Sequence, residues 1–419
     1  MKKQLLSLFL VFAVLSINAQ STDIPNGHRC STTEHMNELF KQNPEWKKSL
    51  ETKDAEMLNA QSDRSVNASA AIITIPVVVH VLWKTTDQNI PDAKILAQIA
   101  QLNLDFAGKN PDTSLIPTPF KSLKANTQIQ FCLAKRDPNG AATTGIKRIQ
   151  TSVTSFSTND AIKSTSSGGS TAWPVSKYLN LWVGNLSSGL LGYAQFPGGP
   201  AATDGVVVSY KTVGSVANPA SFSWPFNYGR SATHEIGHWL SLYHIWGDEN
   251  NCTGSDQVTD TPNQTSPNSA CPSYPRIDAC SPSSPGVMFM NYMDYVDDAC
   301  MVMFSSGQKT RITSTMNGSR SALKTSLGCS AVTGIADYSY TIGNTLVYPN
   351  PSNGKYTIDL GEIINKVDLT VTDVYGRLVE KKNISSTQLF DIEINQAAGI
   401  YFIHLMYDDK KDIVKVIKQ

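Results

Sequence analysis

The 419-residue sequence lacks an excess of charge of either sign. Lysine and arginine together number 35, aspartate and glutamate together also number 35, and no long run of one sign occurs. Proteins that bind nucleic acids or anionic membranes through bulk charge carry a clear basic excess. The composition therefore argues against a nucleic-acid partner and against a polybasic membrane-binding surface.

The sequence also lacks an apolar run long enough to span a bilayer, which takes about 20 residues. Its apolar stretch at 5–15 follows Lys2 and Lys3 and ends in the small residues of 16–19, a pattern typical of a signal peptide. We therefore predict a signal peptide over residues 1–19, no transmembrane segment, and a secreted or cell-surface protein. Disulfides form in that compartment.

Two common catalytic motifs are missing as well. The chain has no G-x-S-x-G elbow and no G-x-x-x-x-G-K-[ST] loop, so it offers no support for a serine hydrolase of that type or for a P-loop nucleotide enzyme.

What the sequence does contain is His234-Glu235-Ile236-Gly237-His238, inside the helical pattern of 231–243. Residues four apart lie on one face of a helix, so both imidazoles reach one ion while Glu235 projects beside the open coordination position. This pattern predicts a zinc hydrolase. His244 becomes a third ligand only if the helix breaks near Ser241. The alternative is a pair of ordinary histidines on a half-buried helix.

Around this motif the hydrophobic pattern alternates between strands and helices. A β-branched run at 72–83 predicts a buried strand, 92–106 a helix, and 129–134, 179–183, 190–196 and 206–210 short strands. An irregular stretch, 248–286, follows the motif. From residue 346 to 419, short alternating runs separated by turn residues predict a small all-β sandwich.

The motif and its surroundings resemble the metzincin metallopeptidases, and within them the pappalysin family. The resemblance rests on HEIGHWLSLYH from 234, DQVTDTP from 256 and NYMDYVDDACMVMFSSGQKTR from 291. It covers roughly residues 72–326. It implies an α/β (α+β) catalytic domain with a mixed sheet and an active-site helix, acting as a zinc-dependent endopeptidase.

The same resemblance implies roles for single residues. His234, His238 and His244 would bind zinc, Glu235 would be the general base, Met293 would form the floor under the metal, and Tyr295 would help to hold the tetrahedral intermediate. Plain core packing is the alternative for Met293 and Tyr295. Ser241 stands where the family pattern has glycine. A helix break there favours φ > 0, which costs a non-glycine residue about 1–2 kcal/mol.

Seven cysteines leave one over if the others pair. The resemblance implies the pairs Cys252 with Cys280 and Cys271 with Cys300. Cys132 and Cys329 either pair or remain two free thiols.

Cys30 resembles the cysteine switch of latent pappalysin-like zymogens, in which a prosegment thiolate occupies the open zinc position. An unpaired thiol in a discarded segment is the alternative. Arg64 is a natural cut site if the enzyme prefers basic residues.

Three further sites are expected. The loop 256–261 offers oxygen ligands suited to calcium, and the resemblance supports Asp256, Thr259 and Thr261; a simple Asx-type turn is the alternative. The segment 190–196 is either an ordinary sheet edge or the edge that pairs with an extended substrate. Asp297 and Asp298 form either a solvated turn or an acidic S1′ pocket for Arg or Lys.

The last module carries YPNPSNG from 348 and AAGIYFIHL from 397, and it resembles the C-terminal sorting domain of type IX secretion cargo. A carbohydrate- or protein-binding sandwich is the alternative. The predicted organisation is a signal peptide (1–19), a prosegment with the cysteine switch (20–64), a metallopeptidase domain (65–328), a linker (329–345) and the sorting domain (346–419).

The predicted protein is thus a latent, secreted endopeptidase that requires zinc and calcium. Its partners would be protein substrates, its own prosegment as inhibitor, and the secretion machinery. Two alternatives remain at this point: a secreted adhesin or binding protein with a structural metal site, and a zinc amidase acting on a non-peptide substrate.

Overall fold

A computed structural model describes residues 29–62, 71–187, 189–220, 225–331, 345–407 and 410–419. The predicted signal peptide, Arg64 and most of the predicted linker lie outside these residues. Within them, no helix is both long and apolar enough to cross a membrane.

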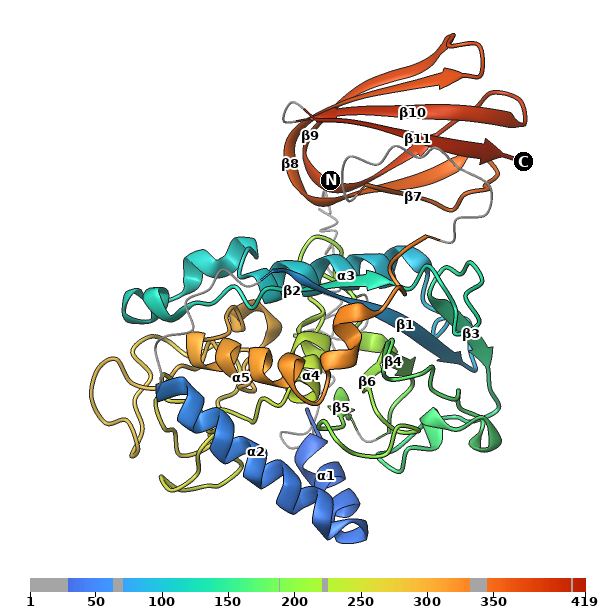
Figure 1. The fold of residues 1–419 in the computed structure, drawn as a ribbon. Helices are drawn as coiled ribbons and strands as arrows, with labels where there is room; N and C mark the ends of the chain where they lie inside the picture. Colours follow the sequence, from blue (N-terminus) through green and yellow to red (C-terminus); the bar gives the residue numbers. More distant parts are fainter. Residues whose placement is uncertain (1–28, 63–70, 188, 221–224, 332–344, 408–409) are drawn as a thin grey trace, which may run out of the picture.

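A six-stranded mixed sheet forms the centre of the first unit (Figure 1). Its strands are β1 (Ile73–Trp83), β2 (Ile129–Leu133), β3 (Ile146–Gln150), β4 (Leu179–Gly184), β5 (Gly192–Ala194) and β6 (Val206–Ser209). The order is β2-β1-β4-β6-β5, with β3 also pairing with β1. All pairs are parallel except β5 with β6. β5 therefore lies at an edge, as expected for 190–196, although it is shorter than that segment.

Helices cover this sheet and position the site. They are α3 (Asp92–Ala107), α4 (Arg230–Trp239) and α5 (Ser306–Asn317), with short 3-10 helices at Pro111–Leu115, Thr118–Leu123, Ala161–Lys163, Thr165–Ser167, Tyr210–Thr212, Asp298–Cys300 and Ser321–Thr325. α5 begins with a capping box between Ser305 and Gln308. α4 ends at Trp239, four residues before the predicted helix end at residue 243, because Ser241 adopts a left-handed backbone conformation.

The N-terminal part of the described chain is helical and forms two helices. α1 (Thr32–Gln42) and α2 (Pro44–Ser62) are separated at Asn43. The residue before a proline is disfavoured in the helical region, and Asn43 is accordingly extended, with φ −142° and ψ 78°. α2 packs against α5 (Figure 1).

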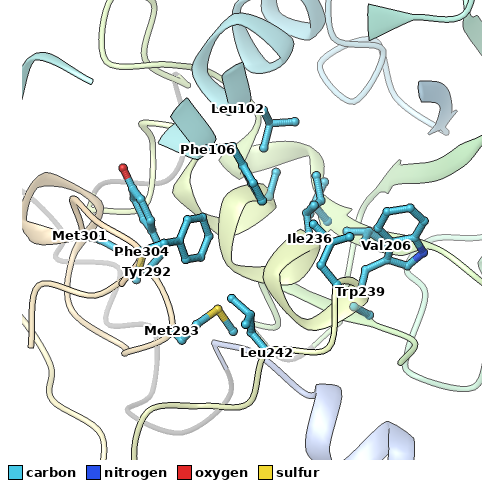
Figure 2. Packing of buried hydrophobic residues seen from close by; sticks show 14 of the residues in the cluster. Leu102, Phe106, Val206, Ile236, Trp239, Leu242, Tyr292, Met293, Met301 and Phe304 are labelled. Carbon is cyan, nitrogen blue, oxygen red and sulfur yellow. The ribbon is translucent and has the colours of Figure 1, made fainter. Parts of the chain in front are cut away.

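The main core lies between the sheet and α3 and α4, and it reaches the chain segment around Met293. Figure 2 shows Leu102 and Phe106 of α3 near Ile236 of α4, with Met293 and Leu242 below them. A methyl group at Gly237 would lie 2.5 Å from the Met293 sulfur. The motif glycine therefore lets the methionine approach the active-site helix.

The C-terminal unit is entirely β, as predicted. It contains β7 (Leu346–Tyr348), β8 (Lys355–Asp373), β9 (Leu378–Glu393), β10 (Gly399–Tyr407) and β11 (Lys410–Lys418). These strands form one antiparallel sheet in the order β11-β10-β8-β7, with β9 pairing with β8. Its alternating inward side chains make a separate core that includes Ile358, Leu369, Ile403 and Val416.

Candidate metal centre and active site

Three histidines converge on one buried point. α4 places His234 and His238 one turn apart, and the Nε2 atoms of His234, His238 and His244 lie 3.1, 3.1 and 3.2 Å from one another. All three side chains are buried. The structure therefore brings together the three residues that the sequence singles out as ligands.

The turn that delivers His244 depends on Ser241. Its φ is +71°, in the left-handed region that costs a non-glycine residue about 1–2 kcal/mol. Leu242 N–H donates to the carbonyl oxygen of Gly237 at 2.9 Å, which closes the end of α4. The structure therefore has the positive φ at Ser241 that a helix break at this residue favours.

Each imidazole is oriented by an acceptor at its other nitrogen. Nδ1 of His234 donates to the Tyr292 carbonyl and Nδ1 of His238 to the Leu242 carbonyl, both at 2.7 Å, and Nδ1 of His244 donates to Asp248 at 2.5 Å. These bonds leave the three facing Nε2 atoms unprotonated in the neutral rings. Burial holds the pKa values of His234 and His238 well below their usual range, and the neighbouring imidazoles lower them further.

This donor set fits zinc. Neutral imidazole nitrogens are preferred zinc ligands, and ligands at about 2.0–2.1 Å in a tetrahedron would stand roughly 3.4 Å apart, close to the spacing observed. Acceptors on the outer ring nitrogens are the usual support of such ligands. Three lone pairs that face one another need a cation between them.

Cys30 completes the cluster from the N-terminal segment. Its Sγ and the three histidine nitrogens all lie within 4.8 Å of one another. The thiol also donates to the Glu235 carboxylate at 3.4 Å, and Thr32 Oγ1 donates to the same oxygen at 2.9 Å. Burial raises the pKa of Glu235 to about 8, against the lowering effect of these two hydrogen bonds.

The segment that carries Cys30 lies along the edge of the sheet. Cys30 forms a parallel bridge with Gly192 of β5, and Ser31 N–H donates to the Gly192 carbonyl at 3.1 Å. On the opposite side, the Tyr295 hydroxyl donates to the Cys30 carbonyl at 3.2 Å. Residues 29–31 therefore fill the cleft between β5 and the segment around Tyr295.

Arg29 lines a small pocket beside the histidines, together with Leu191, Tyr295 and Asp298 among others. Its guanidinium donates to the Val296 carbonyl at 2.7 Å and lies 3.8 Å from the centre of the Phe226 ring. Burial lowers the pKa of Arg29 to about 10, while the negative charges of Asp298 and Asp297 act in the opposite direction. A basic side chain and the Asp298 carboxylate therefore line the same pocket, with the charge of Asp297 close enough to act on Arg29.

Met293 is fully buried and packs against α4 (Figure 2). Its backbone N–H donates to the Asn291 side chain at 2.9 Å. Met293 is therefore a core residue next to the active-site helix, and its role as the floor under the metal stays a prediction.

Three disulfides crosslink the described chain. Cys252 is bonded to Cys280 and Cys271 to Cys300, as the resemblance implies, and Cys132 is bonded to Cys329. The last pair settles the alternative between a disulfide and two free thiols. Cys30 is the free cysteine.

The proposed calcium loop contains a buried turn. Asp256 accepts from the Val258 N–H at 3.1 Å and from the Thr261 hydroxyl at 2.8 Å, which is the Asx-type arrangement named as the alternative. Burial raises the pKa of Asp256 to about 7. Neither observation tests a role for Asp256, Thr259 or Thr261 in calcium binding, which stays a prediction.

Two polar residues at the site escape the sequence analysis. Asp248 supports His244, and its spacing of four residues from that histidine is the signal that identifies it. Thr32 donates to Glu235, accepts from the Ala194 N–H at 2.9 Å, and gives no signal in the sequence, because its partner lies about 200 residues away.

Comparison with known proteins agrees with this geometry. Residues 164–317 match the family model described as pregnancy-associated plasma protein-A, and residues 346–419 match the one described as secretion system C-terminal sorting domain. An extracellular metalloprotease of Arthroderma benhamiae is 31% identical over 269 residues, which are 63% of this chain and 86% of that protein. One from Pyricularia oryzae is 30% identical over 318 residues, 73% and 94% of the two chains.

Solved structures give the same result. A promirolysin mutant from Tannerella forsythia aligns with a TM-score of 0.66 and 42% identity, covering 73% of this chain and all of that one. Mature mirolysin in complex with a cleaved peptide aligns with a TM-score of 0.61 and 47% identity, covering 64% of this chain and all of that one. The chain therefore belongs to the pappalysin family and is a secreted zinc metalloendopeptidase.

Proposed function

We propose that this endopeptidase is made as a latent precursor, that Cys30 blocks its metal centre, and that Glu235 is its general base. The observation that carries the proposal is the convergence of three imidazoles, one carboxylate and one prosegment thiol in a single buried cluster. Such a cluster offers both the catalytic groups and the means to silence them.

Latency follows from what Cys30 and its neighbours occupy. A thiolate is an excellent zinc ligand, and Cys30 stands beside the three histidines where a water would otherwise bind. The backbone of 29–31 also takes the hydrogen bonds of β5, which we propose pairs with an extended substrate once the prosegment is gone. The related promirolysin structure is consistent with such a precursor.

In the mature enzyme, Glu235 and Tyr295 would act on the substrate. Zinc, when bound to His234, His238 and His244, supplies a Lewis acid that lowers the pKa of water and polarises a carbonyl. Glu235 would take a proton from the attacking water and deliver it to the nitrogen of the departing amine. The Tyr295 hydroxyl, which donates to the Cys30 carbonyl in the precursor, would donate to the oxyanion of the substrate.

We further propose that the pocket around Arg29 is the S1′ site and favours Arg or Lys at P1′. The prosegment arginine would then occupy the place of a substrate side chain. Asp297 and Asp298 supply the negative charge, and burial raises the pKa of Asp298 to about 6 while Arg29 lowers it. An arriving cation therefore favours the ionised carboxylate.

Glu235→Ala tests the catalytic role. We expect the processed variant to lose casein hydrolysis by at least about a hundredfold while retaining one zinc per chain, because the three imidazoles remain. Glu249→Ala, which removes an exposed carboxylate in the same part of the chain, is the matched control and should be fully active. Turnover in Glu235→Ala at the level of the control would refute the mechanism.

Calcium and the sorting module complete the proposal. We propose that Asp256, Thr259 and Thr261 contribute to a calcium site that stabilises the loop behind the active-site helix. The C-terminal unit, which matches the sorting-domain model, would be recognised by the secretion machinery and then removed.

A further inference from the structure

A further polar contact between the N-terminal helices and the catalytic unit is made by α2. Asp54, in the middle of α2, is almost completely buried. One of its carboxylate oxygens accepts from Arg311 Nη2 of α5 at 2.6 Å, and the other accepts from the Tyr243 hydroxyl at 2.5 Å. Both oxygens are therefore bound by donors of the catalytic unit.

Arg311 is a buried cation with an incomplete set of partners from its own unit. Its side chain has no exposed surface, and its Nε and Nη2 donate to the Ser241 carbonyl at 3.1 and 2.9 Å. Its Nη1 has no hydrogen-bond partner among the described residues. Within the described chain, the one carboxylate in ion-pair contact with Arg311 is Asp54.

A buried guanidinium is costly without an anion, and the carboxylate in direct contact with Arg311 comes from a segment that we propose is removed on maturation. The surrounding contact is mainly apolar: Met36, Trp46 and Leu50 of the prosegment pack with Phe196, and the Trp46 indole donates to the Pro197 carbonyl at 3.0 Å. Asp54 adds a charged contact between α2 and α5.

We infer that Arg311 and Tyr243 form a carboxylate-binding site on the catalytic unit, which Asp54 fills in the precursor and which holds the prosegment independently of Cys30. The ligand class is a carboxylate on an acidic side chain, and the committed occupant is α2 of this chain. The inference rests on the proposed function in one respect, namely that the N-terminal segment leaves the mature enzyme.

The test measures how fast the prosegment leaves after the chain is cut. A recognition sequence for a site-specific protease is placed within 63–70 of the full-length Glu235→Ala precursor, and the release of the prosegment after cleavage is followed by size-exclusion chromatography. Asp54→Asn should release it at least about tenfold faster, because one member of a buried ion pair is lost. Tyr243→Phe should give an intermediate rate.

Glu51→Gln is the matched control, since Glu51 lies one turn earlier on α2 and is exposed, and its release rate should equal that of the parent. The tenfold effect of Asp54→Asn should persist in a Cys30→Ala background. Equal release from Asp54→Asn and Glu51→Gln, or loss of the effect without Cys30, would overturn the inference.

The release rate does not depend on a folding defect of the catalytic unit. Residue 54 departs with the prosegment, so the catalytic unit left behind is chemically identical in Asp54→Asn and in the parent, and its thermal unfolding should coincide with that of the parent. The readout also needs no proteolytic activity. An inactive enzyme would therefore count against the proposed function but leave this inference standing.

Discussion

Replacing Ser241 by glycine should stabilise the enzyme, although it removes a buried side chain next to the metal centre. Ser241 has a φ of +71°, which costs a residue with a Cβ about 1–2 kcal/mol. Its hydroxyl oxygen is buried and has no hydrogen-bond partner among the described residues, at a cost of about 1–3 kcal/mol. Glycine removes both costs.

An opposing effect comes from the unfolded chain, which glycine makes more flexible by about 0.4–1 kcal/mol. The balance is a gain of about 1–4.5 kcal/mol in the free energy of unfolding. For a unit of this size each kcal/mol raises Tm by roughly 2–4 °C, so Ser241→Gly should melt about 2–18 °C above the parent.

Thermal unfolding in the inactive Glu235→Ala background, which avoids self-digestion, measures this shift. Ser241→Ala separates the two costs, because it removes the hydroxyl but keeps the Cβ in the left-handed region. It should therefore lie between the parent and Ser241→Gly. A Ser241→Gly variant that melts at or below Ser241→Ala would refute the assignment of strain to this turn.

Four other outcomes follow from the same structure. Asp248→Ala should weaken zinc binding by about 10–100-fold in a competition titration, because His244 loses the acceptor that orients it; affinity equal to that of Glu249→Ala would contradict this. Cys30→Ala should yield a precursor that is active without a lag, whereas an unchanged lag would exclude the thiol as the block. Calcium should raise Tm more at pH 8 than at pH 5.5. Burial raises the pKa of Asp256 to about 7, so the fold loses stability as pH rises and this carboxylate ionises. A bound calcium ion offsets that loss. A calcium effect on Tm of the same size in Asp256→Asn would argue against the site. A peptide-library digest should show Arg and Lys enriched directly after the cleaved bond, and a flat P1′ profile would remove the role given to Asp297 and Asp298.

The sequence predicts the parts of this molecule that depend on local pattern. The β-branched run of β1 and the helical spacing of α3 give their elements directly, and the spacing of His234 and His238 already places two ligands on one helical face. The resemblance added the disulfides Cys252–Cys280 and Cys271–Cys300. These features require few contacts between distant parts of the chain.

The remainder depends on contacts that pattern does not encode. The helix α4 is shorter than its apolar periodicity indicates. The turn at Ser241 ends the helix and places His244 beside the other two histidines. Likewise, the sequence around Asp54 does not indicate that its partner is Arg311, which lies 257 residues away in the chain. The local sequence pattern therefore does not predict the strained turn at Ser241 or the buried ion pair between Asp54 and Arg311.

The most direct test of the account is proteolysis by the purified, processed enzyme before and after removal of its metal. A zinc chelator should abolish casein hydrolysis, and addition of zinc should restore it, with Glu235→Ala inactive throughout. Hydrolysis that persists after the zinc has been removed, as verified by elemental analysis, would contradict the central claim that the three histidines hold a catalytic metal.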